Sequence, residues 1–309
     1  MSTTLYFILG CTASGKGATG REIARRLDTD VISVDSMKVY KRMDIGTAKP
    51  PADVRAQIPH HCVDVVEPWE SYSVARFVED ADRAVTEIRN AGKIPLAVGG
   101  TSLYIKALSE GLFEGPKADP ELRRQLEQEI RSRGLASLHD ELSEVDPDAA
   151  RRIHPNDEKR IVRALEVYRT SGTPISELQR QWNDQPDRYD CVRIGLRRPK
   201  DEQNRRINAR AKKMMDLGLV EEVRALLGDP RGLSPQAAQA VGYAELIDHF
   251  QGKCTVEEAF ERIKINTRRL AKKQRTWMRR WQDVTWFDVA EEETAEGLAD
   301  RIMSEVEFS

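Results

Sequence analysis

Short apolar runs alternate with longer amphipathic segments over the first third of the chain. The runs at 5–9, 30–34 and 94–98 are rich in apolar, often β-branched residues and have the length of buried strands. Residues 72–90 instead repeat apolar side chains at spacings of three and four, which is the spacing of one helix face. Strands that alternate with helices are typical of a parallel sheet flanked by helices, so we predict an α/β fold.

The pattern changes after Gly111. Between 121 and 182 one helical segment follows another without a convincing strand, and Pro116 and Pro120 mark the start of this region. We therefore predict an all-helical insertion domain at 116–191.

A strand pattern returns after the insertion, at 191–196 and again at 284–287. A helix is expected from about residue 199, and an acidic amphipathic helix at 291–307. The core domain should therefore consist of two parts of the chain, 1–115 and 192–309.

The strand predicted at 5–9 leads directly into a glycine-rich loop. The spacing from Gly10 to Gly15 and Lys16 matches G-x-x-x-x-G-K, in which backbone N–H groups converge on phosphate oxygens at a helix N-terminus and the lysine adds a positive charge. The glycines could instead form only a tight turn. The apolar strand before the loop and the amphipathic helix at 21–27 after it favour the phosphate-binding interpretation and a core of the P-loop NTPase type.

One position departs from this motif. The residue after the lysine usually carries a hydroxyl group that ligates Mg²⁺, and in this chain it is Gly17. A magnesium ion would have to be held by other groups, for which Asp35 and Ser36 are the candidates.

Polar residues follow two of the predicted strands. Asp35 and Ser36 come after the run at 30–34, at the strand end that faces the ligand crevice in open α/β sheets. Asp35 could bind Mg²⁺ through water, act as a base, or cap the following turn. Gly99 and Gly100 permit a close backbone approach to a ligand, and Thr101 either offers a hydroxyl group there or caps the next helix.

We predict a role at the site for the segment 37–51 but none for the two histidines that follow it. Lys38, Lys41, Arg42 and Lys49, with Tyr40 among them, predict a basic, partly aromatic loop over the site. His60 and His61 are adjacent and cannot share a face in regular structure, so we expect them to form hydrogen bonds and to have no catalytic or metal-binding part.

Composition excludes several classes of protein. The chain has 309 residues, of which 39% are hydrophobic and 32% charged, as in a globular protein with a sizeable core. Its cysteines form no C-x-x-C pair, which argues against a disulfide framework and a zinc site and agrees with a reducing cytoplasm. No apolar run approaches transmembrane length. We expect a cytoplasmic protein without a membrane partner.

The formal net charge is only −2, but the charges are strongly segregated. Residues 262–281 contain nine Lys or Arg and no acidic residue. At helical spacing, this segment would dock through Ile263, Leu270, Trp277 and Trp281 and leave its cations on the surface, where a phosphate backbone is the natural partner.

Two further groups of cations share a helix face or a helix end. Arg206 and Arg210 are spaced i and i+4, a geometry suited to gripping a diphosphate. Lys159, Arg160 and Arg163 lie at the start of a predicted helix, where positive charge opposes the helix dipole. The latter cluster either has a polyanionic partner or is a solvated surface.

Taken in order, several stretches resemble the bacterial tRNA dimethylallyltransferases over nearly the whole chain. Each motif would be weak alone, but the ordered set is highly specific. Gly17 replaces the usual Thr or Ser of that family, and Ala244 stands where basic or polar residues often occur. The matching stretches are GCTASGKG, SVDSMKVYKRMDIGTAKP, PHHCVDVVEP, VGGTSLYIKAL, RIHPNDEKRIVRALEVY, VGYAE and RLAKKQRTWMRRW.

The resemblance implies transfer of a dimethylallyl group from dimethylallyl diphosphate to N6 of adenosine 37 in the anticodon stem-loop of tRNA. By this matching, Asp35 would be the base and Thr101 would lie near the target base. The departing diphosphate would be neutralised by Lys16, by the N–H groups of the loop, by Arg210 and by Mg²⁺ as the cofactor. We expect the protein to be a monomer.

The residues implied by the resemblance fall into three sets. The catalytic set is Asp35, Thr101 and Arg210. The diphosphate-binding set is Gly10, Cys11, Thr12, Ala13, Ser14, Gly15, Lys16, Gly17 and Arg206. The tRNA-binding set is Asp35, Ser36, Met37, Lys38, Thr101, Arg123, Lys159, Arg160, Ile161, Val162, Arg163, Gln239, Ala240, Val241, Gly242, Tyr243, Ala244, Lys272, Lys273, Gln274, Arg275, Thr276, Trp277, Met278 and Arg279.

Three other functions share part of this pattern. A small-molecule kinase would share the phosphate loop and require ATP, but it has no evident use for the basic helix at 262–281. A transferase acting on free AMP would share the chemistry but should lack a tRNA-sized basic face. A noncatalytic RNA-binding module would have no need of Asp35 beside the loop.

Overall fold

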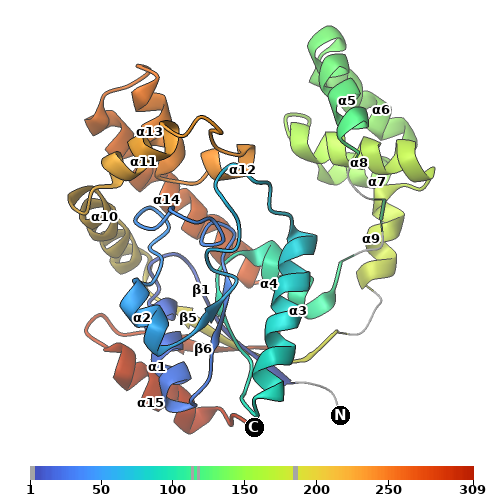
Figure 1. Ribbon diagram of the computed structural model, residues 1–309. Helices are drawn as coiled ribbons and strands as arrows, with labels where there is room; N and C mark the ends of the chain where they lie inside the picture. The colour runs from blue at the N-terminus through green and yellow to red at the C-terminus, as the bar shows by residue number, and fades with distance from the viewer. Residues whose placement is uncertain (1–3, 113–114, 117–118, 184–186) are drawn as a thin grey trace. The chain divides into compact units, whose positions relative to one another are not determined.

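Two compact units make up the protein, and the second is inserted into the chain of the first. The computed structural model describes residues 4–112, 115–116, 119–183 and 187–309. The first unit consists of Met1–Ser109 and Arg188–Ser309, and the second of Glu110–Asp187 (Figure 1).

The boundaries of the second unit differ from the predicted 116–191. The N–H of Arg188 donates to the carbonyl of Ser109 at 2.8 Å, and Asp190 and Cys191 already pair with the first strand. These residues therefore belong to the core, because their backbone groups are satisfied there. Within the predicted insertion, residues 117–118 and 184–186 lie outside the described residues.

A six-stranded sheet with the order β3-β2-β4-β1-β5-β6 forms the centre of the first unit, and its strand pairs are parallel. From Leu5 onward β1 is buried, and β2 and β4 are buried over their whole length, as in strands covered on both faces. The predicted α/β fold is confirmed. The strands are β1 (Thr4–Gly10), β2 (Val31–Val34), β3 (His60–His61), β4 (Leu96–Gly99), β5 (Asp190–Arg197) and β6 (Val284–Asp288).

Helices lie on both sides of this sheet. On one side α1 and α15 pack together, and Ile23, Leu298 and Ile302 share a core with Ile8 and Ile194 of the sheet. Figure 1 shows α3 and α4 on the other side. The helices of this unit are α1 (Lys16–Arg26), α2 (Ala52–Gln57), α3 (Val74–Asn90), α4 (Ser102–Glu110), α10 (Lys200–Asp216), α11 (Leu219–Leu227), α12 (Pro235–Ala238), α13 (Tyr243–Phe250), α14 (Val256–Met278) and α15 (Ala295–Glu305).

The long helix α14 connects the sheet to the group of helices α10 to α13. It contacts α10, α13 and β1. Its start is fixed by a capping box, in which the Thr255 hydroxyl group accepts from the N–H of Glu258 and the Glu258 carboxylate accepts from the N–H of Thr255. This basic helix therefore passes directly beside the strand that leads into the phosphate loop.

The face through which α14 docks differs from the predicted one. Ile263 is buried as expected, but Leu270 is 39% exposed and the predicted Trp277 is only partly buried. The buried residues of α14 are Ala259, Ile263, Ala271 and Met278. Ala271 packs against Ile207 of α10, and its small side chain allows the close approach that Leu270 would prevent. The prediction for Leu270 was therefore wrong, whereas Trp277 and Trp281 are partly buried.

The second unit consists of helices around a core of its own. Its helices are α5 (Pro120–Arg133), α6 (Leu135–Val145), α7 (Pro147–Arg152), α8 (Glu158–Ser171) and α9 (Ile175–Asn183). The core contains Leu126, Leu138, Leu142, Ile161 and Leu165. Side chains of three aspartates cap helix N-termini in this unit, at Asp119, Asp146 and Asp157.

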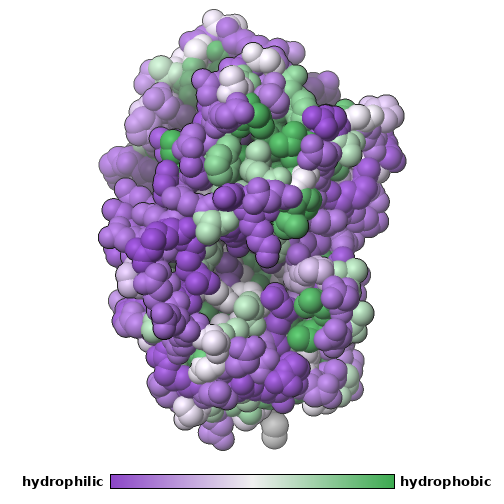
Figure 2. Space-filling model, turned by 90° about the vertical axis from the view of Figure 1, so that its left-hand side faces the viewer, coloured by the Kyte–Doolittle hydropathy of each residue, from purple (hydrophilic) through white to green (hydrophobic). Residues whose placement is uncertain are grey.

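The surface of the protein is hydrophilic over most of the face shown in Figure 2, with apolar residues gathered in small patches. None of the helices in the described ranges is long and apolar enough to cross a membrane. Within the described residues, Cys11, Cys62, Cys191 and Cys254 form no disulfide bond.

Candidate active site

The phosphate loop joins β1 to α1 with the geometry that its glycines predict. Gly15 has φ 103°, a conformation that L side chains rarely adopt. A Cβ on Gly10 would lie 2.3 Å from the Ser14 hydroxyl oxygen, so only glycine allows the loop to fold back on itself. The Lys16 ammonium group donates to the carbonyl of Cys11 at 3.3 Å across the loop.

Three side chains from the segment that contains α10 hold the loop from outside. Gln203 Nε2 donates to the carbonyl of Thr12 at 2.9 Å, Arg206 Nε to that of Ala13 at 3.3 Å, and Arg198 Nε to that of Ser14 at 3.0 Å. Donor and acceptor in these bonds are separated by 184 to 193 positions in the sequence. Drawing three successive carbonyl groups outward favours an interior lined by N–H groups, which is what binds phosphate.

A polar pocket of about 500 Å³ opens over this loop. It brings together the predicted Lys16 of α1, Asp35 after β2, and Arg206 and Arg210 of α10. The lining residues are Thr12, Ala13, Gly15, Lys16, Gly17, Ala18, Arg21, Asp35, Lys38, Ala48, Val98, Gly99, Arg206, Ala209, Arg210 and Gln274. Cations therefore dominate the pocket.

The crowding of positive charge changes the titration of these cations. The pKa of Lys16 is lowered to about 8, mainly by burial and in addition by the charges of Lys38 and Arg210, while the carboxylate of Asp35 acts in the opposite direction. Burial also lowers the pKa of Lys38 and of Arg210, again opposed by Asp35. A polyanion in the pocket would relieve this repulsion.

Asp35 caps the turn that follows β2. Its Oδ1 accepts from the N–H of Met37 at 2.9 Å and from the N–H of Lys38 at 3.3 Å. The capping role that the sequence left open is thus real, and it orients the carboxylate in the pocket wall. The Thr101 hydroxyl accepts from the N–H of Ser36 at 3.1 Å, which ties this turn to the start of α4.

A second pocket, of about 100 Å³, adjoins the polar one and shares Thr12, Asp35 and Arg210 with it. Its other walls are mainly apolar or formed by small residues. They comprise Met37, Gly46, Thr47, Ile207, Ala211, Met214, Ala240, Val241, Gly242, Ile263, Thr267 and Leu270. The two pockets together suit a ligand with a strongly anionic end and an apolar end, and the carboxylate of Asp35 lies where they meet.

A family model described as IPP transferase matches residues 38–281. The chain belongs to the IPP transferase family. It is 46% identical to a tRNA dimethylallyltransferase of Geobacter sulfurreducens over 93% of this chain and 92% of that protein. It is 43% identical to a tRNA dimethylallyltransferase of Carboxydothermus hydrogenoformans over 99% of this chain and 98% of that protein.

Solved structures give the same family. The full-length tRNA isopentenylpyrophosphate transferase from Bacillus halodurans is 40% identical, with a TM-score of 0.70, and the match covers 98% of this chain and 96% of that one. A eukaryotic dimethylallyltransferase acting on tRNA is 28% identical, with a TM-score of 0.80 and coverage of 98% of this chain and 78% of that one. The fold of this IPP transferase family member is thus that of known tRNA-modifying enzymes.

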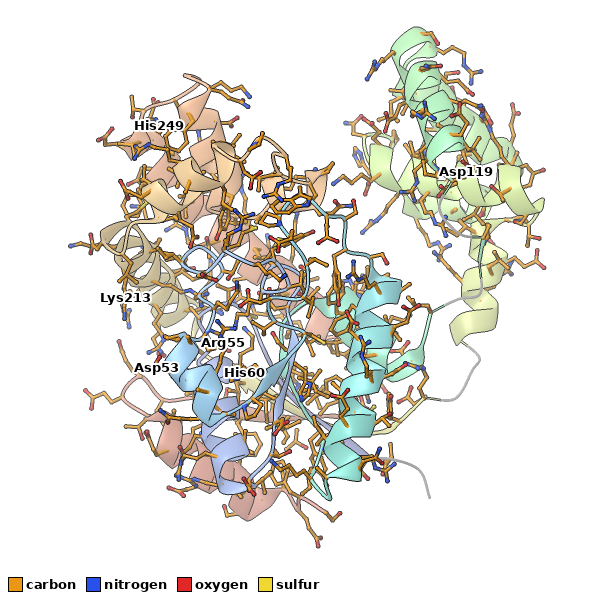
Figure 3. All side chains as sticks on the ribbon, in the orientation of Figure 1. Asp53, Arg55, His60, Asp119, Lys213 and His249 are labelled. Atoms are coloured by element: carbon orange, nitrogen blue, oxygen red, sulfur yellow. The ribbon has the colours of Figure 1, made fainter. Side chains whose placement is uncertain are left out.

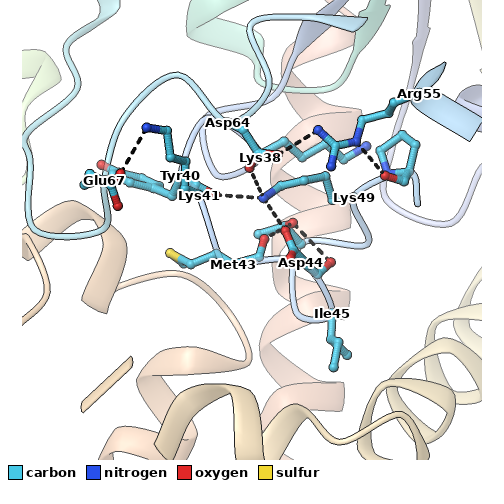
Figure 4. Close-up of polar contacts among 12 residues, drawn as sticks. Lys38, Tyr40, Lys41, Met43, Asp44, Ile45, Lys49, Arg55, Asp64 and Glu67 are labelled. Carbon is cyan, nitrogen blue, oxygen red and sulfur yellow. Dashed lines mark hydrogen bonds and ion pairs between the residues drawn. The ribbon is translucent and has the colours of Figure 1, made fainter. Parts of the chain in front are cut away.

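The loop predicted to be basic lines both pockets, but of its four cations only Lys38 is among the lining residues. Lys49 is buried and donates to the carbonyl of Tyr40 at 2.8 Å and to the carboxylates of Asp44 and Asp64 at 2.5 Å each (Figure 4). Lys41 pairs with a glutamate outside the pocket. Lys49 therefore has a structural role inside the loop, because two carboxylates and a carbonyl compensate the burial of its charge.

Glu222 of α11 was not identified from the sequence. Its carboxylate accepts from the N–H groups of Asp44, Ile45 and Gly46 at 2.9, 2.8 and 3.2 Å, and from the Tyr243 hydroxyl at 2.5 Å. Glu222 thereby fixes the loop that lines both pockets. The partners are up to 178 residues away in sequence, and nothing in the local sequence marks them.

Some predicted RNA-binding residues have no side chain available at the surface. Ile161, Ala240, Tyr243 and Met278 are buried, with exposed fractions of 0, 4, 0 and 1%. Their side chains offer little surface to a macromolecular partner, and Ile161, Tyr243 and Met278 are part of the hydrophobic core. Ala240 lines the apolar pocket together with Val241 and Gly242.

The basic residues of α14 and of its C-cap, Arg279, divide into two groups. Lys272, Lys273 and Arg279 are exposed. Arg275 turns inward and donates to Gln203 Oε1 at 2.9 Å, and Arg268 donates to Asn208 at 3.3 Å. The exposed group remains the candidate for electrostatic contact with nucleic acid.

In the helical unit, the predicted cations also differ in their surroundings. Lys159 and Arg160 are exposed at the start of α8. Arg123 and Arg163 instead converge on the fully buried carboxylate of Glu166, with Nε and Nη1 at 2.8 and 2.6 Å. These two guanidinium groups compensate a buried charge and are held in place by it.

His60 takes no part in either pocket. It lies on the edge strand β3, close to Arg55 in Figure 3, and its Nδ1 is 2.6 Å from the carbonyl of Ile58. Burial lowers the pKa of His60 to about 4. Its partner His61 is 3.1 Å from Asp30. The expected hydrogen-bonding role of both histidines is confirmed.

No group of three or more His, Cys, Asp or Glu side chains in the described ranges is arranged to hold a metal ion. Mg²⁺ nevertheless commonly binds through one or two carboxylates together with substrate phosphates and water. The polar pocket supplies one carboxylate, Asp35, beside the phosphate loop. These residues fit a magnesium ion that is held mainly by a bound diphosphate.

Proposed function

We propose that this protein is a tRNA dimethylallyltransferase. It transfers the dimethylallyl group of dimethylallyl diphosphate to N6 of adenosine 37 in the anticodon stem-loop and releases diphosphate. The observation that carries this proposal is the pair of adjoining pockets, one cationic and one apolar, with Asp35 and Arg210 in the walls of both. Membership in the IPP transferase family supports the same conclusion.

Asp35 acts as the base in the proposed reaction. The exocyclic amine of adenine is a poor nucleophile, because its lone pair is delocalised into the ring. As this lone pair forms the bond from N6 to C1 of the allyl group, the bond from C1 to oxygen breaks and its electrons leave with the diphosphate. The amine then carries an excess proton, which the Asp35 carboxylate accepts. The two backbone N–H groups that bind Oδ1 keep this carboxylate oriented.

The cationic pocket stabilises the leaving group. Lys16, Arg210 and the N–H groups of the phosphate loop bind the diphosphate oxygens, with Arg206 at the pocket rim, and negative charge on these oxygens increases as the bond breaks. A bound Mg²⁺ would be held by the diphosphate, with Asp35 or Ser36 as a ligand through water, and would supply further positive charge. Gly17 contributes no hydroxyl group to it.

The adenine must leave the anticodon loop to reach C1 from the side opposite the diphosphate. The apolar pocket beside Asp35 offers a place where it can meet the allyl group without water. Thr101 supports this geometry through the N–H of Ser36. The exposed cations of α14 and of the α8 start, such as Lys272, Lys273 and Lys159, bind RNA phosphates. We propose that the enzyme acts as a monomer.

Incubation with an unmodified tRNA transcript and radiolabelled dimethylallyl diphosphate tests this function directly. Nuclease digestion should yield labelled N6-(dimethylallyl)adenosine, and a transcript with guanosine at position 37 should remain unlabelled. Label in free AMP would instead indicate a nucleotide transferase. Transfer of the γ-phosphate of ATP without prenylation would indicate a kinase, because only that reaction requires ATP.

A further inference from the structure

Gln274 differs from its neighbours on α14. The residues before it, Lys272 and Lys273, are exposed, whereas Gln274 is partly buried and lines the polar pocket. Its Oε1 accepts from the N–H and the hydroxyl of Thr12 at 2.9 and 3.3 Å, and its Nε2 donates to the carbonyl of Gly100 at 2.9 Å. The side-chain amide is thus satisfied by the core of the protein, although its place in the motif predicted a tRNA contact.

These bonds join the ends of two neighbouring strands. Thr12 belongs to the phosphate loop after β1, and Gly100 follows β4, which pairs with β1. A Cβ on Gly100 would lie 2.8 Å from Gln274 Nε2 and 2.7 Å from the carbonyl oxygen of Gly10. The glycine that the sequence predicted to approach a ligand is therefore also required for the approach of α14.

The next residue of α14 completes the contact with Thr12. Arg275 Nη1 donates to Gln203 Oε1 at 2.9 Å, and Gln203 Nε2 donates to the carbonyl of Thr12 at 2.9 Å. The N–H and the carbonyl of one loop residue are therefore both held from α14, directly by Gln274 and indirectly by Arg275. Backbone groups held on both sides lose their freedom to rotate, so the loop is ordered before a ligand arrives.

We propose that Gln274 is a positioning residue for diphosphate binding: it holds Thr12 and Gly100 so that the phosphate loop keeps its anion-binding conformation. This inference rests on the proposed function only for the identity of the diphosphate substrate. According to this proposal, Gln274 affects the binding of the diphosphate and does not contact the RNA. Without these bonds, the ordering of the loop must be driven by the ligand, which lowers affinity for the ligand.

Two variants of Gln274 and a matched control separate the roles. Gln274→Met keeps most of the volume without hydrogen bonds, Gln274→Ala removes both, and Lys273→Ala changes the exposed neighbour. Isothermal calorimetry with inorganic pyrophosphate in the absence of tRNA should show a Kd raised about tenfold in both Gln274 variants, equivalent to about 1.4 kcal/mol. The KM for dimethylallyl diphosphate should rise in parallel, while the Kd for tRNA stays within about twofold.

Lys273→Ala should behave in the opposite way. It should weaken tRNA binding and reduce the slope of log K against log salt by about one, with the pyrophosphate Kd unchanged. Thermal unfolding of each variant establishes that the measured protein is folded.

Wild-type pyrophosphate affinity in Gln274→Met would overturn the proposal, because its hydrogen bonds would then have no effect on the loop. Weakened tRNA binding with unchanged pyrophosphate affinity would also overturn it and would assign Gln274 to the RNA. If the wild-type protein fails to prenylate tRNA while the Gln274 variants still bind pyrophosphate weakly, the proposed function fails and the positioning role stands.

Discussion

Gly17→Thr tests how this protein binds magnesium without the hydroxyl group that usually follows the lysine of the phosphate loop. Gly17 is the second residue of α1 and lines the polar pocket. We expect a threonine hydroxyl at this position to reach the diphosphate-bound metal. The half-saturating Mg²⁺ concentration should fall, while turnover at saturating metal should change little because Asp35 is untouched.

The structure allows the substitution without strain. Gly17 is absent from the residues with positive φ, and a Cβ there would lie 3.5 Å from Arg21 Nη1, an ordinary contact with the end of a flexible side chain. Threonine is a slightly better helix former than glycine, so the free energy of unfolding should rise by no more than about 0.5 kcal/mol. For the metal, one additional ligand should lower the half-saturating concentration by about threefold to tenfold, which corresponds to roughly 0.7 to 1.4 kcal/mol.

The assay is a magnesium titration of the initial rate at fixed, saturating tRNA and dimethylallyl diphosphate. Gly17→Ala serves as the matched control, since it changes the backbone in the same way and adds no hydroxyl group. Titration of pyrophosphate binding against Mg²⁺ gives a second readout without catalysis. Superimposable curves for the Thr, Ala and wild-type proteins would refute the reasoning and would show that a hydroxyl at this position is not a metal ligand.

Four further outcomes follow from the site. Asp35→Asn should lower the single-turnover rate by about a hundredfold or more with tRNA affinity retained, because an amide oxygen can still accept the two N–H groups; an unchanged rate would exclude Asp35 as the base. Lys272→Glu combined with Arg279→Glu should flatten the salt dependence of tRNA binding by about two units and leave pyrophosphate binding within twofold, as filter binding over a salt series can check. The pyrophosphate Kd should be constant below the Lys16 pKa of about 8 and rise above it, because a bound anion favours the protonated amine; in Lys16→Arg this rise should disappear. Glu222→Ala should lower the free energy of unfolding by about 2 kcal/mol or more in urea, since it leaves several donors without an acceptor, whereas a loss below about 0.5 kcal/mol would contradict that role.

Much of the core of this protein is visible in its sequence because the relevant signals are local. A buried strand, a glycine-rich turn and a helix follow one another within the first part of the chain, and each is specified by residues a few positions apart. The phosphate loop at Gly10 to Lys16 and the position of Asp35 after β2 follow from such patterns. Since the carboxyl ends of parallel strands meet at one edge of the sheet, the sequence also predicted that these residues lie together, and they line one pocket.

Periodicity was less reliable for choosing which side chains of a helix are buried. Leu270 fits the apolar stripe of α14, yet the smaller Ala271 forms the contact with α10. Lys49 was predicted as one of the cations of a basic loop, but the carboxylate of Asp44 in the same loop and that of Asp64 in a neighbouring segment compensate its burial. In both cases, whether a side chain is buried depends on the distance and the charge of a neighbouring part of the fold. The local pattern of apolar and charged residues does not contain that information.

The sequence by itself determined the alternation of strands and helices, the phosphate loop and the segregation of positive charge, because these depend on neighbours along the chain. Only the tertiary structure decided that Glu222 fixes the loop beside the pocket, that Gln203 and Gln274 hold Thr12 from outside, and that Tyr243 is a core residue. Those bonds join groups separated by up to 262 positions. A hydrogen bond stabilises a structure only when donor and acceptor lie about 3 Å apart. Only folding brings groups that are so distant in sequence to that separation.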